Sequence, residues 1–149
     1  MTQVGLAQQA AADRDQIAED LALPSGLEAY RLGVAVALAK NLPPADESAR
    51  RTNAYGVSSI DTQDGAIRAS ILALRSDHVG RPYALMERLA EAGLRDLAEH
   101  LNAGLPIRQY LSALLPPVAE SNSQPSDNAE RQPGDAPEGT RAAAPEPSS

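Results

Sequence analysis

The segment from Pro82 to Gly104 repeats apolar residues at helical spacing, and this pattern constrains the fold more than any other feature of the chain. Such spacing places the apolar side chains on one face of an α-helix, which other elements must then cover. Pro82 suits the first turn of the helix, and Gly104 suits its C-terminal end. The predicted buried face consists of Met86, Leu89, Ala90, Gly93, Leu97 and Leu101.

Gly93 lies in the middle of this predicted helix. Glycine in a helix interior costs about 1 kcal/mol relative to alanine, so its presence needs a reason. One interpretation is a close crossing with a second helix, and we favour it. The alternative is a break that divides the segment into two shorter helices.

The apolar residues of the whole chain favour helices over strands. Phe and Trp are absent, and the only aromatic side chains besides histidine are four tyrosines. Alanine and leucine dominate instead, whereas strands are enriched in aromatic and β-branched residues. We therefore predict an all-α fold, a small bundle of about five helices.

The other predicted helices begin and end at recognisable signals. One extends from about Val4 to Leu23, and the next from the capping-box sequence at Ser25–Glu28 to about Asn41. Two more are predicted, from Asp61 to about Leu74 and over residues 106–115. Residues 43–60 form a long connection, in which residues 54–60 permit a short strand that has no evident partner.

A change in composition after Pro116–Pro117 divides the chain in two. Residues 119–149 are rich in Pro, Ser, Gly and acidic residues and contain almost no large apolar side chain. Such a segment cannot bury enough apolar surface to offset the entropy of ordering it. We predict a helical domain over residues 1–118 and a disordered tail over 119–149, either an inert extension or a tether that binds a partner.

The charge and cysteine content disfavour several classes of protein. Thirteen Lys and Arg face twenty Asp and Glu, and a net charge of −7 gives no general attraction for nucleic acid or an anionic membrane. The chain has no cysteine, so disulfides and thiolate metal sites are absent. Its N-terminus lacks the pattern of a signal peptide, and residues 32–39 are far short of the ~20 apolar residues that span a bilayer. We expect a cytoplasmic protein without a membrane segment.

Asp61 and Asp64 stand close together beside Gly65, which raises the question of a metal or acid–base site. A helix-loop-helix calcium loop that began at Asp61 would need a glutamate at its twelfth position, where the chain has Leu72. A simpler interpretation is that Asp61 is the N-cap of a helix and Asp64 lies in its first turn, where negative charge complements the helix dipole. We therefore predict a structural role for both carboxylates and no metal.

Residues with catalytic or cofactor-binding chemistry form no recognisable motif. His78 and His100 are too few and too far apart for a zinc site, and no glycine-rich loop matches a phosphate-binding motif. Residues 86–104 resemble a helix-turn-helix, but the second helix would be net acidic, with one arginine to offer to a base edge. We expect no catalytic residues, no cofactor and no metal.

Four arginines in or near loops are the best candidates for a binding site. Arg50, Arg51, Arg75 and Arg81, together with Tyr55, would form one modest patch if the fold brought them together. Arginine binds carboxylates and phosphates in bidentate fashion. Our leading hypothesis is a non-catalytic accessory or regulatory protein that acts by binding a protein partner or itself. The alternative is a nucleic-acid-associated regulator that uses the Arg50 and Arg51 loop, and an unrecognised enzyme comes third.

Overall fold

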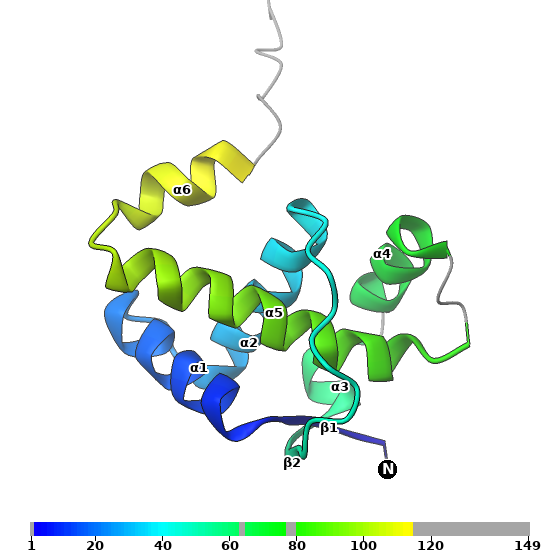
Figure 1. The fold of residues 1–149 in the computed structure, drawn as a ribbon. Coiled ribbons are helices and arrows are strands. Elements are labelled where there is room, and N and C mark those ends of the chain that lie inside the picture. Colours follow the sequence, from blue (N-terminus) through cyan, green and yellow to red (C-terminus); the bar gives the residue numbers. More distant parts are fainter. Residues whose placement is uncertain (1, 63–64, 77–79, 115–149) are drawn as a thin grey trace, which may run out of the picture. The chain divides into compact units, whose positions relative to one another are not determined.

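The computed structural model describes residues 2–62, 65–76 and 80–114, and these residues are mostly helical (Figure 1). A small two-stranded sheet accompanies the helices, so the fold is not purely all-α as the sequence predicted. In chain order the elements are β1 (Gln3–Leu6), α1 (Gln8–Asp20), α2 (Gly26–Ala39), β2 (Thr52–Gly56), α3 (Val57–Ile60), α4 (Ala66–Leu74), α5 (Pro82–Asn102) and α6 (Ile107–Leu114). The predicted disordered tail, residues 119–149, lies outside the described residues.

The sheet corrects the prediction of a helix from Val4. Strand β1 pairs antiparallel with β2, and Val4 lies opposite Tyr55. The first helix begins only at Gln8. Gly5 contributes to the difference, because glycine disfavours a helix and its lack of a side chain lets Thr52 approach: a Cβ atom on Gly5 would lie 2.8 Å from the Thr52 carbonyl oxygen. No partner strand for residues 54–60 was evident in the sequence. Strand β2, which overlaps them, pairs with β1 near the N-terminus of the chain.

Helices α2 and α5 cross at two glycines, and this crossing forms the centre of the domain (Figure 1). A Cβ atom on Gly93 would lie 1.8 Å from the carbonyl oxygen of Gly33. Helix α5 continues unbroken from Pro82 to Asn102, so the interpretation of Gly93 as a close crossing is confirmed. Since α5 contains no turn, the segment that resembled a helix-turn-helix is a single helix.

The apolar core surrounds this crossing. Helix α1 packs against both α2 and α5, and α4 packs against α5. Tyr30 and Val34 of α2 and Met86 and Leu94 of α5 are almost completely buried. None of the helices in the described part of the chain is long and apolar enough to cross a membrane.

The N-terminus of α2 differs from the predicted capping box. Ser25 is the N-cap residue, but its side chain makes no capping hydrogen bond. The Glu28 carboxylate instead pairs with Arg31, at 3.1 Å from Nη1. Arg31 also donates to the carbonyl oxygens of Ser59 and Ile60, at 2.6 and 3.1 Å, and so joins α2 to α3. Glu28 therefore orients the Arg31 side chain and does not cap the N-terminus of α2.

Candidate functional site

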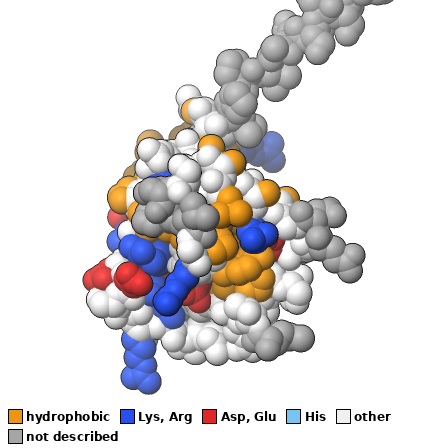
Figure 2. Space-filling view, turned by 90° about the vertical axis from the view of Figure 1, so that its right-hand side faces the viewer, with side chains coloured by type: hydrophobic (Ala, Val, Ile, Leu, Met, Phe, Trp, Pro, Cys, Tyr) orange, Lys and Arg blue, Asp and Glu red, His pale blue; other side chains and the backbone are white. Residues whose placement is uncertain are grey.

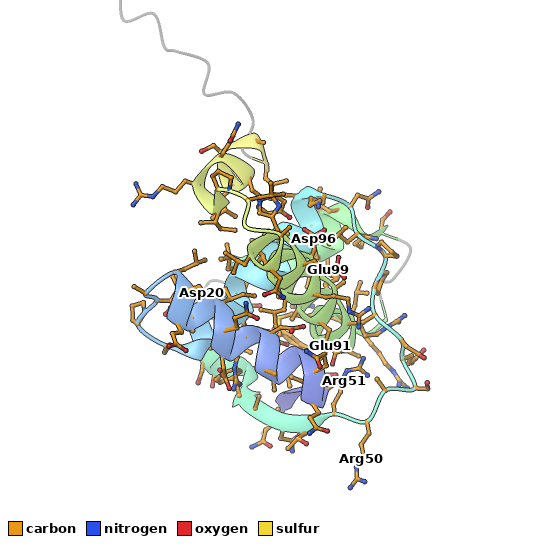
Figure 3. The ribbon with its side chains drawn as sticks, turned by 60° about the vertical axis from the view of Figure 1, so that its left-hand side comes forward. Asp20, Arg50, Arg51, Glu91, Asp96 and Glu99 are labelled. Atoms are coloured by element: carbon orange, nitrogen blue, oxygen red, sulfur yellow. The ribbon has the colours of Figure 1, made fainter. Side chains whose placement is uncertain are left out.

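Arg51, which the sequence placed in the binding patch, is bound inside the domain. Its Nε and Nη2 donate to the two carboxylate oxygens of Glu91, at 2.9 and 2.8 Å. Its remaining donors reach the carbonyl oxygens of Asp46, Glu47 and Ala49. Figure 3 shows Arg51 beside Glu91, which is only 2% exposed. The five N–H groups of a guanidinium are all used in this way, so Arg51 has no donor left for a ligand.

Two glutamates of α5 also fasten strand β1. The Glu87 carboxylate accepts a hydrogen bond from the Gly5 amide at 2.6 Å, and Glu91 accepts one from the Ala7 amide at 2.8 Å. The Gly5 amide would otherwise be unpaired at the outer edge of a short strand, and the Ala7 amide would be unpaired at the N-cap of α1. Burial, and secondarily the charge of Glu87 and Glu91, raises the pKa of the nearby Tyr30 hydroxyl. The acidic groups here hold the sheet against α5, which is a structural role.

Tyr55 and Arg75 also make contacts within the domain. The Tyr55 hydroxyl accepts a hydrogen bond from Arg14 at 3.2 Å, and the Arg14 guanidinium lies 5.7 Å from the centre of the tyrosine ring. Arg75 donates to the carbonyl oxygen of Leu42 at 2.5 Å, which ties the end of α4 to the residues that follow α2. Both side chains therefore stabilise connections between elements.

Arg50 and Arg81 are exposed but lie in different grooves. Arg81 lines a groove of about 490 Å³ beside the first turn of α5. Arg51 and Arg88 also line it, and Glu47 and Glu87 offset part of the positive charge. Arg50 lines a second groove, of about 600 Å³, over α1 and β2, and it points away from the helices in Figure 3. Of the five residues predicted as one patch, Arg51 and Arg81 thus line one groove, whereas Arg50 lines another, and Arg75 and Tyr55 line neither.

Asp61 is buried, at 6% exposure. Its carboxylate accepts hydrogen bonds from the first turn of α4, although Asp61 precedes the N-cap residue of that helix. It accepts hydrogen bonds from the backbone amides of Ile67 and Arg68, both at 3.1 Å, and from the Tyr83 hydroxyl at 3.3 Å. The N-cap residue is Gly65, in the left-handed conformation with φ 58°, so the prediction of Asp61 as N-cap is wrong. Asp64 lies outside the described residues.

Replacing Asp61 by alanine should lower the free energy of unfolding by about 1–2 kcal/mol, because two amides of α4 and a tyrosine hydroxyl lose their acceptor. Asp61→Asn keeps one acceptor oxygen and should lose less. Urea denaturation followed by circular dichroism measures both. Thermal melting with added Ca²⁺ or Mg²⁺ should show no saturable shift; a shift that Asp61→Ala abolishes would instead establish a metal site.

A surface that the sequence did not predict lies over α2. A groove of about 360 Å³ separates α2 from α4, and one of about 190 Å³ separates α2 from α6. Ala35 and Ala39 line both grooves, so the two form one apolar surface. We call it the α2 face; its residues are Leu32, Ala35, Leu38 and Ala39 of α2, Ile67 and Leu74 of α4, and Leu111 and Leu114 of α6.

The α2 face is partly exposed: Ala35, Ala39 and Leu74 are exposed, and its other five residues are half-buried and pack against the core. Leu74 is 61% exposed, the most of any large hydrophobic side chain in the described part of the chain. Figure 2 views the domain from the side of α4 in Figure 1, and hydrophobic side chains gather there next to basic ones. Helix α2 is apolar on more than one side, and a helix that is covered on most sides has the same sequence pattern as one with an open face.

Helix α6 forms one wall of the α2 face and is held by polar contacts. Lys40 lies 2.6 Å from a carboxylate oxygen of Asp96, and the Tyr110 hydroxyl donates to the same carboxylate. The Lys40 ammonium also lies 5.1 Å from the centre of the Tyr110 ring. The hydrogen bond to Asp96 is the largest cause of the raised pKa of Lys40, so the ammonium stays charged. No residue of α6 is fully buried, which is typical of an amphipathic helix on a surface.

The side chains of residues 2–62, 65–76 and 80–114 include no group of three His, Asp or Glu that could hold a metal ion. Comparison with protein families, curated proteins and solved structures gives no match for this chain. The function is therefore inferred from the surfaces of the domain itself.

Proposed function

We propose that the protein is a non-catalytic helical protein that acts by binding another protein, and that the α2 face is its binding surface. The observation that carries this proposal is the pair of apolar grooves on either side of Ala35 and Ala39. A contiguous apolar surface on a small domain is costly to leave in water and is typical of an interaction site. The proposed function is the one predicted from the sequence, but its binding surface is the α2 face and not the arginine patch.

The arginines support this change of site. Arg51 has its donors occupied by Glu91 and by backbone carbonyls, and Arg75 bonds the carbonyl of Leu42. Arg51 cannot bind a partner without losing a contact that stabilises the domain, and Arg75 uses its Nη2 in such a contact. By contrast, the α2 face offers leucine and isoleucine side chains that already lie at the surface, and burial of apolar area is the main favourable term in protein association.

Arg50 is the observation that favours the alternative, a nucleic-acid-associated function. It is exposed, and it shares a groove with Arg14. Arg14 is paired with Asp15 at 2.6 Å, so little positive charge is left for phosphates. A gel shift that weakens steeply with added salt and is lost in Arg50→Glu would support this second function.

Capture of partners from an extract of the native host tests the proposal. The tagged full chain should retain a second protein that Ala35→Glu loses by at least about 10-fold, because a carboxylate would then be buried in an apolar interface. Ala35 is exposed on α2, so the substitution should leave the fold intact.

The matched control is Ala12→Glu, an equally exposed alanine on α1. It introduces the same charge away from the α2 face and should retain the partner. The proposal is contradicted if the captured protein is lost from Ala12→Glu or Arg50→Glu but kept by Ala35→Glu. Circular dichroism melting of each variant shows whether the domain is folded.

A further inference from the structure

Helix α6 is attached to the rest of the domain by few side chains. None of its residues is fully buried, and the half-buried ones are Ile107, Tyr110, Leu111 and Leu114. Among the described residues, Tyr110 is the only side chain of α6 with a hydrogen bond to another element, from its hydroxyl to Asp96. Helices α2 and α5, by contrast, each contain several almost completely buried side chains. Segments with little buried surface open at a lower free energy than the core.

A groove remains between α6 and α2 even with α6 in place. It measures about 190 Å³, and it lies between Val36 and Ala39 of α2 on one side and Leu111 and Leu114 of α6 on the other. Closely packed helices interdigitate their side chains and leave few voids. The apolar side chains of α6 therefore shield this side of α2 from water without packing fully against it.

The contact that holds α6 also has an unfavourable component. The ring centres of Tyr110 and His100 lie 4.2 Å apart. The Nε2 atom of His100 is buried and has no hydrogen-bond partner among the described residues. A buried polar atom without a partner is unfavourable, and departure of the Tyr110 ring would give this atom access to water. Docking of α6 is thus opposed at the same place where Tyr110 stabilises it.

The connection between α5 and α6 has the properties of a hinge. Residues 103–106 are all exposed, and the Leu105 side chain is 51% exposed. Gly104 has φ 70°, in the left-handed region that glycine adopts without strain. Apart from its chain neighbours, no described atom lies within 4 Å of the position of its Cβ. The backbone here can rotate without disturbing packed side chains, as hinge residues do.

We propose that α6 is a displaceable lid on α2, which leaves its site by rotation at residues 103–106 while the rest of the domain stays folded. An eight-residue helix is too short to be stable in water by itself, so α6 unfolds when it leaves. Its departure uncovers Leu32 and Val36, which line the groove, and so enlarges the α2 face. The opening does not depend on the proposed function, but its effect on a bound partner does.

Native-state hydrogen exchange of the full chain tests the lid. The amides of residues 110–114 bond within α6 and are the probes of its opening. They should exchange at least about 100-fold faster than the slowest amides of α5, because the core stays closed when α6 opens. They should still exchange more slowly than in a peptide of residues 103–116, since α6 is docked most of the time.

A pair of tyrosine variants tests the attachment. Tyr110→Phe removes the hydroxyl that bonds Asp96 and keeps the ring. It should accelerate exchange in α6 by about 10-fold, the effect of losing one hydrogen bond to a charged group, and leave the slowest amides of α5 unchanged. The matched control is Tyr83→Phe, whose hydroxyl bonds Asp61 near α4. It should leave exchange in α6 unchanged.

A crosslink should hold the lid closed. The chain has no cysteine, so Ala39→Cys combined with Leu111→Cys gives a single pair of thiols on opposite sides of the groove. A short bismaleimide that joins them should slow exchange in α6 by at least about 10-fold relative to the same variant without the crosslinker. An unchanged rate would show that the exchange does not come from movement of α6 away from α2.

Three other results would overturn the inference. Equal exchange in α6 and α5 would show that α6 opens only with the whole domain, and exchange as fast as in the peptide would show that α6 is not docked. Acceleration of the slowest α5 amides by Tyr110→Phe would show that α6 belongs to the cooperative core.

Capture from a host extract separates the lid from the proposed function. Tyr110→Phe should retain more of a partner that Ala35→Glu loses, and Tyr83→Phe should retain the same amount as the unmodified chain. Loss of the partner with Ala35→Glu but no gain with Tyr110→Phe would sustain the proposed function and contradict the effect of the lid on binding. Fast exchange in α6 with a partner that Ala35→Glu retains would sustain the lid and contradict the proposed function.

Discussion

Replacing Glu91 by alanine should destabilise the domain by about 3–5 kcal/mol, the cost of leaving one partner of a buried ion pair uncompensated. Glu91 is 2% exposed and accepts hydrogen bonds from Arg51 and from the Ala7 amide. Its removal leaves the Arg51 guanidinium without its carboxylate partner and the Ala7 amide without an acceptor. Urea denaturation at neutral pH, followed by circular dichroism, measures the change in the free energy of unfolding.

Glu99→Ala is the matched control for this prediction. Glu99 lies on the same helix but is exposed, so its loss should change stability by no more than about 0.5 kcal/mol. Substitution of Arg51 and Glu91 together by methionine should be less destabilising than the sum of the two single changes, because no unpaired charge is left. If Glu91→Ala is as mild as Glu99→Ala, the structural role assigned to Arg51 is wrong.

Replacing Gly93 by alanine should destabilise the domain by about 3 kcal/mol or more, at the upper end of overpacking effects. The added Cβ would lie 1.8 Å from the Gly33 carbonyl oxygen, and a backbone atom cannot move aside as a side chain does. Helices α2 and α5 would have to separate, which opens the centre of the core. The gain in helix propensity, about 1 kcal/mol, opposes this effect but is smaller.

Gly80→Ala separates the packing effect from the general effect of a glycine substitution. Apart from its chain neighbours, no atom of residues 2–62, 65–76 and 80–114 lies within 4 Å of the position of its Cβ, so this change should shift the free energy of unfolding by less than about 1 kcal/mol. Equal denaturation midpoints for Gly93→Ala and the unmodified protein would show that the two helices do not cross as closely as described.

The features of the fold that are local in sequence could be predicted. Pro82 begins α5 as expected, and Gly104 follows its end in the left-handed conformation, with φ 70°. The apolar spacing of α5 also followed from the sequence, because helical periodicity repeats within a few residues; the close crossing at Gly93 was favoured over a helix break, but its partner Gly33 was not predicted. These signals depend on backbone geometry, which short segments determine by themselves.

Contacts between distant segments could not be predicted. Strand β1 pairs with a strand about fifty residues later, and neither is long enough to be recognised alone. Arg51 and Glu91 are forty residues apart, and an arginine in a polar loop has the same local sequence whether it is exposed or paired in the interior. The donors to the Asp61 carboxylate were also hidden, since the amides of Ile67 and Arg68 lie six and seven residues further along the chain.

The α2 face could not be predicted from the sequence for the same reason. Ala35 and Ala39 belong to an apolar helix, and apolar periodicity does not distinguish a covered face from an open one. The distinction depends on how far α4 and α6 lie from α2, which is a tertiary property.

The most direct test of the central claim is photo-crosslinking in the native host. A photoreactive amino acid placed at Ala39, on the floor of the α2 face, should crosslink the full chain to a second protein. The same residue at Ala12 on α1 or at Arg50 should give no such product. A crosslink to a protein from Arg50 and none from Ala39 would contradict the assignment of the α2 face as the binding surface.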